Sequence, residues 1–499
     1  MTDLIDSILL HINTHTIPPA SRDRPEEPLC LYSVNRELSL SLVFNYRFSC
    51  DIIVTMRVII VGAGEVGFQI SKFLTAEGIE VAVIDRNKEN LKRVSEALDV
   101  SVVEGEGGVP SVLKDAGADE ADILIAVTDM DETNMIACLV AKVMFQIPRN
   151  VARIRSFEYI SNLPLLNSLG INPAISPEVE AGKAVIRLIE APFATDLEDF
   201  EDGRVKVIGF RVPADSKLIG EALKYLNLND PKILVGAIQR GKQLIIPKGN
   251  DTIRKDDVIF LAIKSENIEP VCRRIGAETR PARSIMIAGG GRIGHYVAKT
   301  MEDRGLMVKV IEKDSERCKF LLKSLTKSVI LHGDGSDEKL LQEENISGMD
   351  IFAAISNNEE VNIMASLLAR SLGAKKVITI VNRTDYLQLA NNLGLETVLS
   401  PRLITASSIL KHVRAGNILS LTTIAEGRAE IMEAEVKEGS IIIGKTLSEI
   451  ELPKGALIGA IIRDDHVIIP SGSDGILNND KLIVFTLKDS IKQVEKLLQ

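Results

Sequence analysis

The chain contains one pattern of residues twice, and this repeat limits the folds that it can adopt. Three glycines with the spacing Gly-x-Gly-x-x-Gly occur at two places 227 residues apart, namely Gly62, Gly64 and Gly67, then Gly289, Gly291 and Gly294. At the same offset, or at one residue more, further residues have counterparts: Asp85 with Glu312, Gly78 with Gly305, Gly105 with Gly333, Asp122 with Asp350, and Asn134 with Asn362. Chance does not keep one register over so many positions, so we interpret the chain as a tandem duplication.

A second kind of block also occurs twice. The stretch LIIPKGNDTIRKDDVIFLAI, which begins at Leu244, resembles VIIPSGSDGILNNDKLIVFTL, which begins at Val467. The blocks therefore alternate as A, B, A, B along a chain of 499 residues. One hydrophobic core does not organise a chain of this length, since domains usually hold about 100 to 200 residues.

The A blocks have the pattern of a parallel sheet with helices on both faces. In the first block, the apolar run 58–61 leads into the glycine motif, a helix follows that stops at Gly78, and the next apolar run, 81–84, leads to Asp85. Later runs at 124–127 and 151–154 are largely apolar as well. Strands that are buried on both faces are typical of α/β proteins, so each A block is predicted to be a Rossmann-like, doubly wound domain.

The B blocks have a different sequence pattern from the A blocks. They contain short strand-like runs with Gly and Asp turns, such as 205–212 and 233–238, and end in helices at 266–275 and 490–498. This pattern predicts a small α+β domain. Helical connectors at 178–190 and 404–413 lie between the blocks, and each follows a Ser-Pro pair, which favours the start of a helix.

We therefore expect four domains, two connectors and one extension. In chain order they are an N-terminal extension that we expect to be poorly ordered (1–55), a first Rossmann domain (56–176), a connector helix (177–198), a small α+β domain (199–280), a second Rossmann domain (281–400), a second connector helix (401–422) and a second small α+β domain (423–499).

The first glycine motif has the features of a dinucleotide-binding turn. It runs Gly62-Ala63-Gly64-Glu65-Val66-Gly67 between a strand and a helix, and Asp85 lies 23 positions after its first glycine. The first glycine allows the sharp turn, the second lets a pyrophosphate approach, and the third lets helix and strand pack closely, while the helix N-terminus offers N–H donors to phosphate. Asp85 is expected to bind the ribose hydroxyls and to repel a 2′-phosphate, which favours NAD(H) over NADP(H).

The second motif keeps this spacing with Gly289, Gly291 and Gly294, and its second strand ends at Glu312. A nucleotide is therefore expected here too. Arg292 lies in the first turn of the helix, where it either reaches a phosphate or simply faces solvent.

Three residues are placed by their strands at the edge where open α/β sheets bind ligands. Thr128 and Asp129 end the fourth strand of the first domain, and Arg153 lies near the end of the next. We predict that they line the nicotinamide side of the site. Alternatively, Thr128 or Asp129 is a helix N-cap, and Arg153 belongs to a surface or subunit-facing pair with Arg155.

Composition excludes several classes of protein. A net charge of -10 argues against sequence-independent binding of nucleic acid, and the five scattered cysteines suggest neither a disulfide framework nor a zinc site. The most apolar stretch, 38–61, is interrupted by charges, and the N-terminus lacks the basic start of a signal peptide. We expect a cytoplasmic protein with no metal site.

Two other functions are compatible with a Rossmann domain. An NAD-dependent oxidoreductase would need a substrate domain with an acid or base, and the six histidines have no acidic partner that spacing identifies. A redox-sensing transcription regulator would need a basic recognition helix, which the sequence lacks. We therefore expect no catalytic residues and a role in regulation.

The segments AVTDMDETNMIACLVAK from Ala126 and VARIRSFEY from Val151, together with the duplicated glycine motif, resemble the TrkA family of peripheral Trk potassium-uptake subunits, over residues 56–499. The resemblance implies two tandem regulator-of-potassium-conductance (RCK) modules. It implies NAD(H) binding at 62–66, Asp85, Thr128, Asp129 and Arg153, with ATP and ADP as further effectors. It also implies a ring, expected to be a homotetramer, on the inner face of the plasma membrane under a membrane-embedded, TrkH/TrkG-like potassium-translocating subunit. The first copy departs from the pattern at 105–108, where the second has Asp334 to Ser336.

Overall fold

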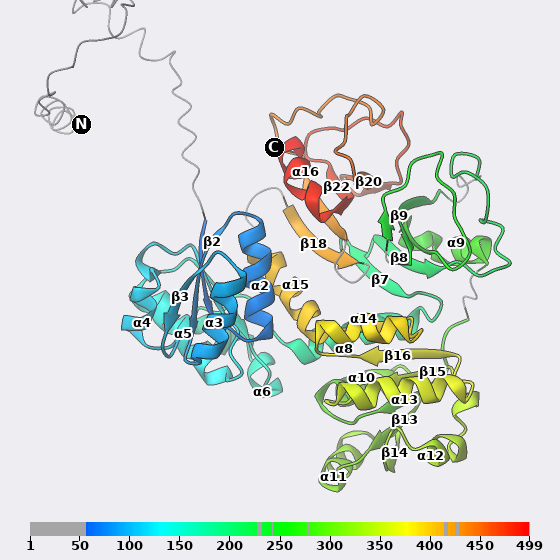
Figure 1. The fold of residues 1–499 in the computed structure, drawn as a ribbon, viewed down its shortest axis with the longest axis horizontal. Coiled ribbons are helices and arrows are strands. Elements are labelled where there is room, and N and C mark those ends of the chain that lie inside the picture. Colours follow the sequence, from blue (N-terminus) through cyan, green and yellow to red (C-terminus); the bar gives the residue numbers. More distant parts are fainter. Residues whose placement is uncertain are drawn as a thin grey trace, which may run out of the picture. The chain divides into compact units, whose positions relative to one another are not determined.

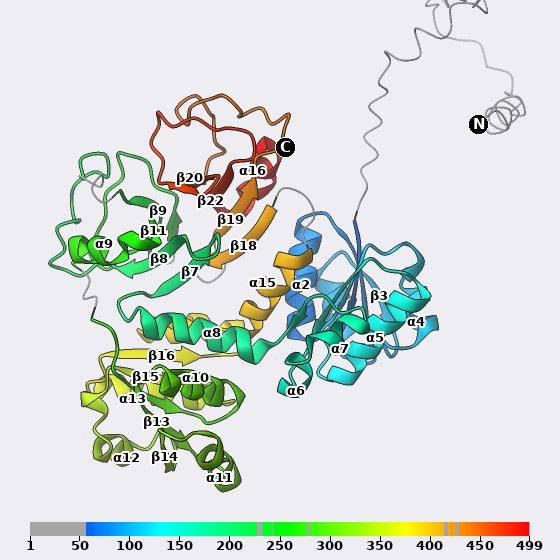
Figure 2. The same ribbon diagram turned by 180° about the vertical axis from the view of Figure 1, so that it is seen from behind.

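The computed structural model describes residues 56–226, 232–241, 243–276, 280–413, 418–424 and 429–498. The extension 1–55 lies outside the described residues. Figures 1 and 2 show the ribbon from opposite sides. Within the described ranges, none of the helices combines the length and the apolar composition that a membrane span requires.

The first A block forms a six-stranded parallel sheet in the order β3-β2-β1-β4-β5-β6. The strands are β1 (Arg57–Val61), β2 (Glu80–Asp85), β3 (Ser101–Glu104), β4 (Ile123–Ala126), β5 (Arg149–Arg153) and β6 (Ala174–Ile175). The main helices are α2 (Glu65–Ala76), α3 (Lys88–Ala97), α4 (Pro110–Asp115), α5 (Asp131–Met144), α6 (Phe157–Ile160) and α7 (Leu163–Ser168). Val58 and Ile60 pack with α2 and α3, whereas Ile59 and Val61 pack with α4 and α5. Both faces of the sheet are therefore covered, which confirms the doubly wound fold.

The second A block repeats this topology in the order β14-β13-β12-β15-β16-β17. Its strands are β12 (Ser284–Ala288), β13 (Met307–Glu312), β14 (Val329–His332), β15 (Ile351–Ala354), β16 (Lys376–Ile380) and β17 (Val398–Leu399). Its main helices are α10 (Arg292–Asp303), α11 (Ser315–Ser324), α12 (Glu338–Glu343), α13 (Glu359–Ser371) and α14 (Thr384–Asn392). In both copies the strand order reverses beside the first strand, and ligands of such sheets bind at this switch point.

The B blocks form two antiparallel sheets, in the orders β10-β9-β11-β8-β7 and β18-β19-β22-β20-β21. The first contains β7 (Asp196–Phe200), β8 (Val205–Arg211), β9 (Leu234–Arg240), β10 (Gln243–Ile245) and β11 (Val258–Lys264), and α9 (Ile268–Ile275) follows. The second contains β18 (Ile418–Ile424), β19 (Ala429–Glu435), β20 (Ala456–Arg463), β21 (His466–Ile468) and β22 (Lys481–Leu487), and α16 (Ile491–Leu498) follows. Phe260 and Phe485 belong to one shared core, so the two sheets pack on each other.

The connectors cross between the halves of the chain. Helix α8 (Pro177–Glu190), from the first half, packs on α10 of the second Rossmann sheet, and Val185 and Ile189 join that core. Helix α15 (Pro401–Val413), from the second half, packs on α2 of the first sheet through Ile409 and Leu410. Both views of the ribbon show these pairs side by side. Each glycine-motif helix is therefore in contact with a connector from the other half.

Candidate nucleotide-binding sites

The first glycine turn has the geometry that its three glycines predict. Gly62 has a φ of +111°, a conformation that side chains disfavour. A Cβ on Gly67 would lie 1.8 Å from the carbonyl oxygen of Gly62, so only glycine lets α2 pack this closely on the turn. A Cβ on Gly64 would meet nothing within 4 Å, which leaves open space at the N-terminus of α2. A phosphate needs this kind of access.

Asp85 holds the turn in place. Its Oδ2 accepts a hydrogen bond of 2.6 Å from the Ala63 N–H, and its Oδ1 accepts one of 2.8 Å from the Asn87 N–H. In the second copy, Glu312 accepts equivalent bonds of 2.8 Å from Gly290 and 2.8 Å from Asp314. A carboxylate has about four acceptor positions, so each group keeps capacity for ribose hydroxyls.

An arginine contacts each glycine turn from the following helix, and sequence reasoning missed both. Arg93 pairs with Glu65, donates to the Ala63 carbonyl over 3.4 Å and lies over the Phe68 ring. In the second copy, Arg317 donates to the Gly290 carbonyl over 2.7 Å and lies over the Phe320 ring. Arg93 and Arg317 are 224 residues apart, and the glycines are 227 apart, so the repeat register does not align them.

The strand ends of the first domain bring the other predicted residues together. The strand β4 ends at Ala126, so Thr128 and Asp129 lie just beyond its end and not within it as expected. Arg153, with a side chain only 15% exposed, donates to Asp129 over 3.1 Å. Burial lowers the pKa of Arg153, and the Asp129 charge partly offsets this. The N-cap alternative was wrong, because the N-cap of α5 is Met130 and neither Thr128 nor Asp129. Arg153 is mostly enclosed and pairs with Asp129, so it does not form a surface pair with Arg155, and its facing another subunit stays a prediction.

Asn134 organises this edge, a role that its place in the sequence repeat does not by itself reveal. Its side-chain oxygen accepts from the N–H and the hydroxyl of Thr128, over 2.9 and 2.7 Å. Its amide nitrogen donates to the carbonyls of Thr128 and Arg153. Asn362 makes the matching bonds to Ser356. In both copies one asparagine thus fixes the end of the strand that borders the switch point.

The second site is a cavity of about 330 Å³. Gly289, Gly291 and Glu312 line it together with Ser356 and Asn362. Val381, which is fully buried, stands where the first copy has Arg153, so this edge lacks the arginine of the first site. Arg292 pairs with Glu178 of α8 over 3.3 Å and therefore does not simply face solvent. Within the described ranges, no group of three or more His, Cys, Asp or Glu residues is placed to hold a metal ion.

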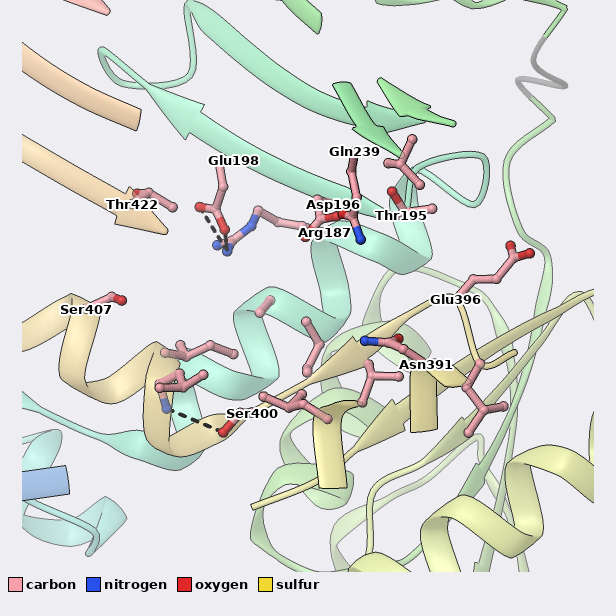
Figure 3. Close-up of a pocket in the computed structure, with 18 of the residues that line it drawn as sticks. Arg187, Thr195, Asp196, Glu198, Gln239, Asn391, Glu396, Ser400, Ser407 and Thr422 are labelled. Carbon is pink, nitrogen blue, oxygen red and sulfur yellow. Dashed lines mark hydrogen bonds and ion pairs between the residues drawn. The ribbon is translucent and has the colours of Figure 1, made fainter. Parts of the chain in front are cut away.

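A larger cavity of about 800 Å³ lies between α8, the start of β7, α14 and α15 (Figure 3). Its wall is polar and its charges are largely paired, with Arg187 to Glu198 over 3.4 Å and Arg211 to Glu396 over 3.1 Å. Lys376 of β16 donates to the Ala194 carbonyl at this junction. Burial lowers the pKa of Lys376 to about 7, and the charges of Asp196 and Glu396 offset part of the shift.

Lys376 is expected to make stability depend on pH. The pKa of an exposed lysine is 10.5, so between pH 7 and pH 10.5 the unfolded chain binds more protons than the folded one. The contribution of this residue to the free energy of unfolding therefore rises with pH in that window. We predict that K376M removes this rise, measured as the difference in Tm between wild type and variant from pH 7 to pH 10. K375M, at the exposed neighbour, is the control; equal pH profiles for wild type and K376M would contradict the assignment.

Comparison with known proteins places the chain in a family. The TrkA-N domain model matches residues 58–177 and 285–401, and the TrkA-C domain model matches 207–276 and 431–499. The chain belongs to the TrkA family. The Trk system potassium uptake protein TrkA of Halomonas elongata is 36% identical over 452 residues, which cover 89% of this chain and 99% of that protein. TrkA homolog 2 of Methanosarcina mazei is 37% identical over 453 residues, covering 89% of this chain and 100% of that protein.

Solved structures agree on the fold. The GsuK channel superposes with a TM-score of 0.59 at 17% identity, over 89% of this chain and 78% of that chain. The GsuK channel bound to NAD gives a TM-score of 0.57 at 17% identity, over 89% of this chain and 79% of that chain. The TrkA relatives are named for potassium uptake, which is transport and not a chemical conversion, so membership of this family supports a chain that is not an oxidoreductase.

Proposed function

We propose that the chain is a cytoplasmic, nucleotide-sensing regulatory subunit of a potassium-uptake transporter, held on the inner face of the plasma membrane by its partner. The observation that carries this proposal is the pair of complete glycine turns, each with open space at its middle glycine and an acidic strand end beside it, within a potassium-uptake family. The absence of a visible substrate domain in the sequence supports binding without chemistry.

The two sites are proposed to bind adenine nucleotides. The first would hold NAD(H) through Gly62, Ala63, Gly64, Glu65, Val66, Gly67, Asp85, Thr128, Asp129 and Arg153, and the second would use Gly289, Gly291, Arg292, Gly294 and Glu312. A GsuK channel of the same fold is bound to NAD, which supports this ligand class. ATP and ADP are proposed as further ligands.

The sites are proposed to differ in preference. The residue after the middle glycine is Glu65 in the first copy, where it pairs with Arg93, and Arg292 in the second. A carboxylate at this position repels additional phosphate charge, and a guanidinium attracts it. We therefore assign the dinucleotide to the first site and ATP or ADP to the second.

A ligand can change transport only if it binds two conformations with different affinity, typically with a coupling of about 1 to 3 kcal/mol. The crossed connectors offer a route, because each glycine-motif helix contacts the connector from the other half. A shift of α2 or α10 on binding would move a helix that leads into a small domain. The proposed receiver is a TrkH/TrkG-like potassium-translocating subunit under a homotetrameric ring, with no nucleic acid involved.

Calorimetric titration of the full chain tests the two-site proposal. NADH and ATP are expected to bind at different sites, so G291V, whose side chain would enter open space, should remove ATP binding and leave NADH binding intact. Circular dichroism before and after heating shows whether the variant is folded. If G291V is folded and binds ATP as wild type does, the second glycine turn is not the ATP site.

A further inference from the structure

Arg292, at the second glycine turn, is held by a carboxylate from the other half of the chain. Its Nη1 lies 3.3 Å from Oε1 of Glu178, which is in the first turn of α8. The same Oε1 accepts from Nε of Arg155, which follows β5 of the first domain, over 3.2 Å. One carboxylate oxygen therefore joins an arginine beside the first ligand edge to an arginine at the second glycine turn.

Glu178, Arg155 and Arg292 form a cluster in which the side chains differ in how tightly they are held. Glu178 is largely enclosed, with a side chain 15% exposed, and its Oε2 is buried without a hydrogen-bond partner among the described residues. The backbone of Arg155 is fixed, because its N–H donates to both carboxylate oxygens of Asp131 over 2.9 and 3.0 Å. The Arg292 side chain is 58% exposed, so it is the member that can change partner at least cost.

The charges at the two helix crossings are reversed. Where α8 meets α10, the connector carries Glu178 and the glycine-motif helix carries Arg292. At the matching positions of the other crossing, α15 carries Arg402 and α2 carries Glu65. A connector carboxylate therefore faces the glycine turn at the second site and not at the first, so an effect of this carboxylate is specific to the second site.

We propose that Glu178 is a positioning residue of the second nucleotide site that competes with ligand phosphate for Arg292. The proposal rests on nucleotide binding at that site. In the free protein Glu178 holds Arg292; on binding, Arg292 exchanges the carboxylate for a phosphate and leaves Glu178 to Arg155. The attraction between Arg292 and a phosphate grows with the charge of the phosphate. ATP therefore competes with Glu178 for Arg292 more effectively than ADP does. The exchange also changes the environment of Arg155, because Glu178 then pairs with Arg155 alone. Arg155 is two residues from Arg153 of the first site, so binding at the second site affects the edge of the first.

The test is the affinity of ATP, ADP and adenosine for the full chain, measured by calorimetry in wild type and E178Q. Removing the competing charge should raise ATP affinity about 5-fold, as expected for an ion pair of about 1 kcal/mol, and should leave adenosine affinity unchanged. The gain should shrink with added salt. E190Q is the matched control, because Glu190, the last residue of α8, pairs with Arg304, the C-cap of α10, at the end of α10 opposite to the glycine turn.

The R292Q background separates this mechanism from a general effect of charge. If Arg292 carries the competition, E178Q should give no gain in ATP affinity in the R292Q protein. A gain that persists there, a gain that E190Q reproduces, or a loss of ATP affinity in E178Q would overturn the proposal. If wild type binds ATP and E178Q binds it equally, the role of Glu178 fails while the second site stands; if wild type binds no nucleotide there, the site itself fails.

Discussion

G64A is expected to weaken NADH binding strongly in a protein that stays folded, whereas G67A is expected to damage the fold. Gly64 has extended backbone angles and open space where its Cβ would lie, so a methyl group there meets only the ligand. A Cβ on Gly67 would lie 1.8 Å from the Gly62 carbonyl oxygen, and backbone must move to make room. Overpacking of this kind costs about 1 to 3 kcal/mol.

Two measurements separate these variants. Thermal unfolding should give G64A a Tm close to that of wild type and G67A a clearly lower one. NADH titration should show at least about a 10-fold loss of affinity in G64A, which corresponds to 1.4 kcal/mol. G291A and G294A provide the same comparison at the second turn. A Cβ on Gly291 would meet nothing within 4 Å, whereas a Cβ on Gly294 would lie 2.0 Å from the carbonyl oxygen of Gly289. Wild-type NADH affinity in G64A would mean that the pyrophosphate lies elsewhere.

D85A is expected to weaken NADH binding and to reduce the discrimination against NADPH. Asp85 is the group that would bind the ribose hydroxyls, and hydrogen bonds to a charged group contribute about 1.5 to 3 kcal/mol, or roughly a 10- to 150-fold change in affinity. NADPH affinity should fall less or rise, because the carboxylate that repels the 2′-phosphate is gone.

Asp85 also supports the glycine turn through the Ala63 N–H, so part of the loss in D85A could come from the turn. D85N keeps an acceptor for this bond and removes the charge, which isolates the electrostatic part. E312A, at the matching position of the second copy, should leave the NADH affinity of the first site unchanged. Equal NADH to NADPH selectivity in wild type and both Asp85 variants would exclude this residue from the ribose site.

The local features of the glycine turns and of the A-block sheets could be predicted from the sequence. Gly62 has a φ of +111°, Gly67 has no room for a Cβ, and Asp85 ends the adjacent strand and bonds to the turn. Each of these features depends only on the glycine turn and the strands and helix next to it. The apolar runs of the A blocks predicted the strands correctly, because strands that are buried on both faces need apolar residues at nearly every position. The repeat then carried these features to the second half.

The contacts between distant segments could not be predicted in this way. An amphipathic connector such as α8 has an apolar face, and its sequence does not say which sheet that face covers. The crossing of α8 to α10, and with it the pairing of Glu178 and Arg292, depends on the arrangement of both halves. Arg93 and Arg317 were missed because the two copies place the arginine on different turns of the helix. The role of Asn134 was within reach, since its recurrence as Asn362 was visible.

Nucleotide bound at the glycine turns is expected to alter potassium transport without being consumed. The most direct measurement is potassium flux into vesicles that contain the membrane-embedded translocating subunit and this chain, with NADH or ATP added and the nucleotide quantified afterwards. We expect the flux to change when nucleotide is added, the change induced by NADH to be lost in G64A, and the nucleotide to be recovered intact. The same flux with and without nucleotide in the wild-type complex would contradict this expectation. A change in flux that is proportional to the amount of NADH oxidised would contradict it as well.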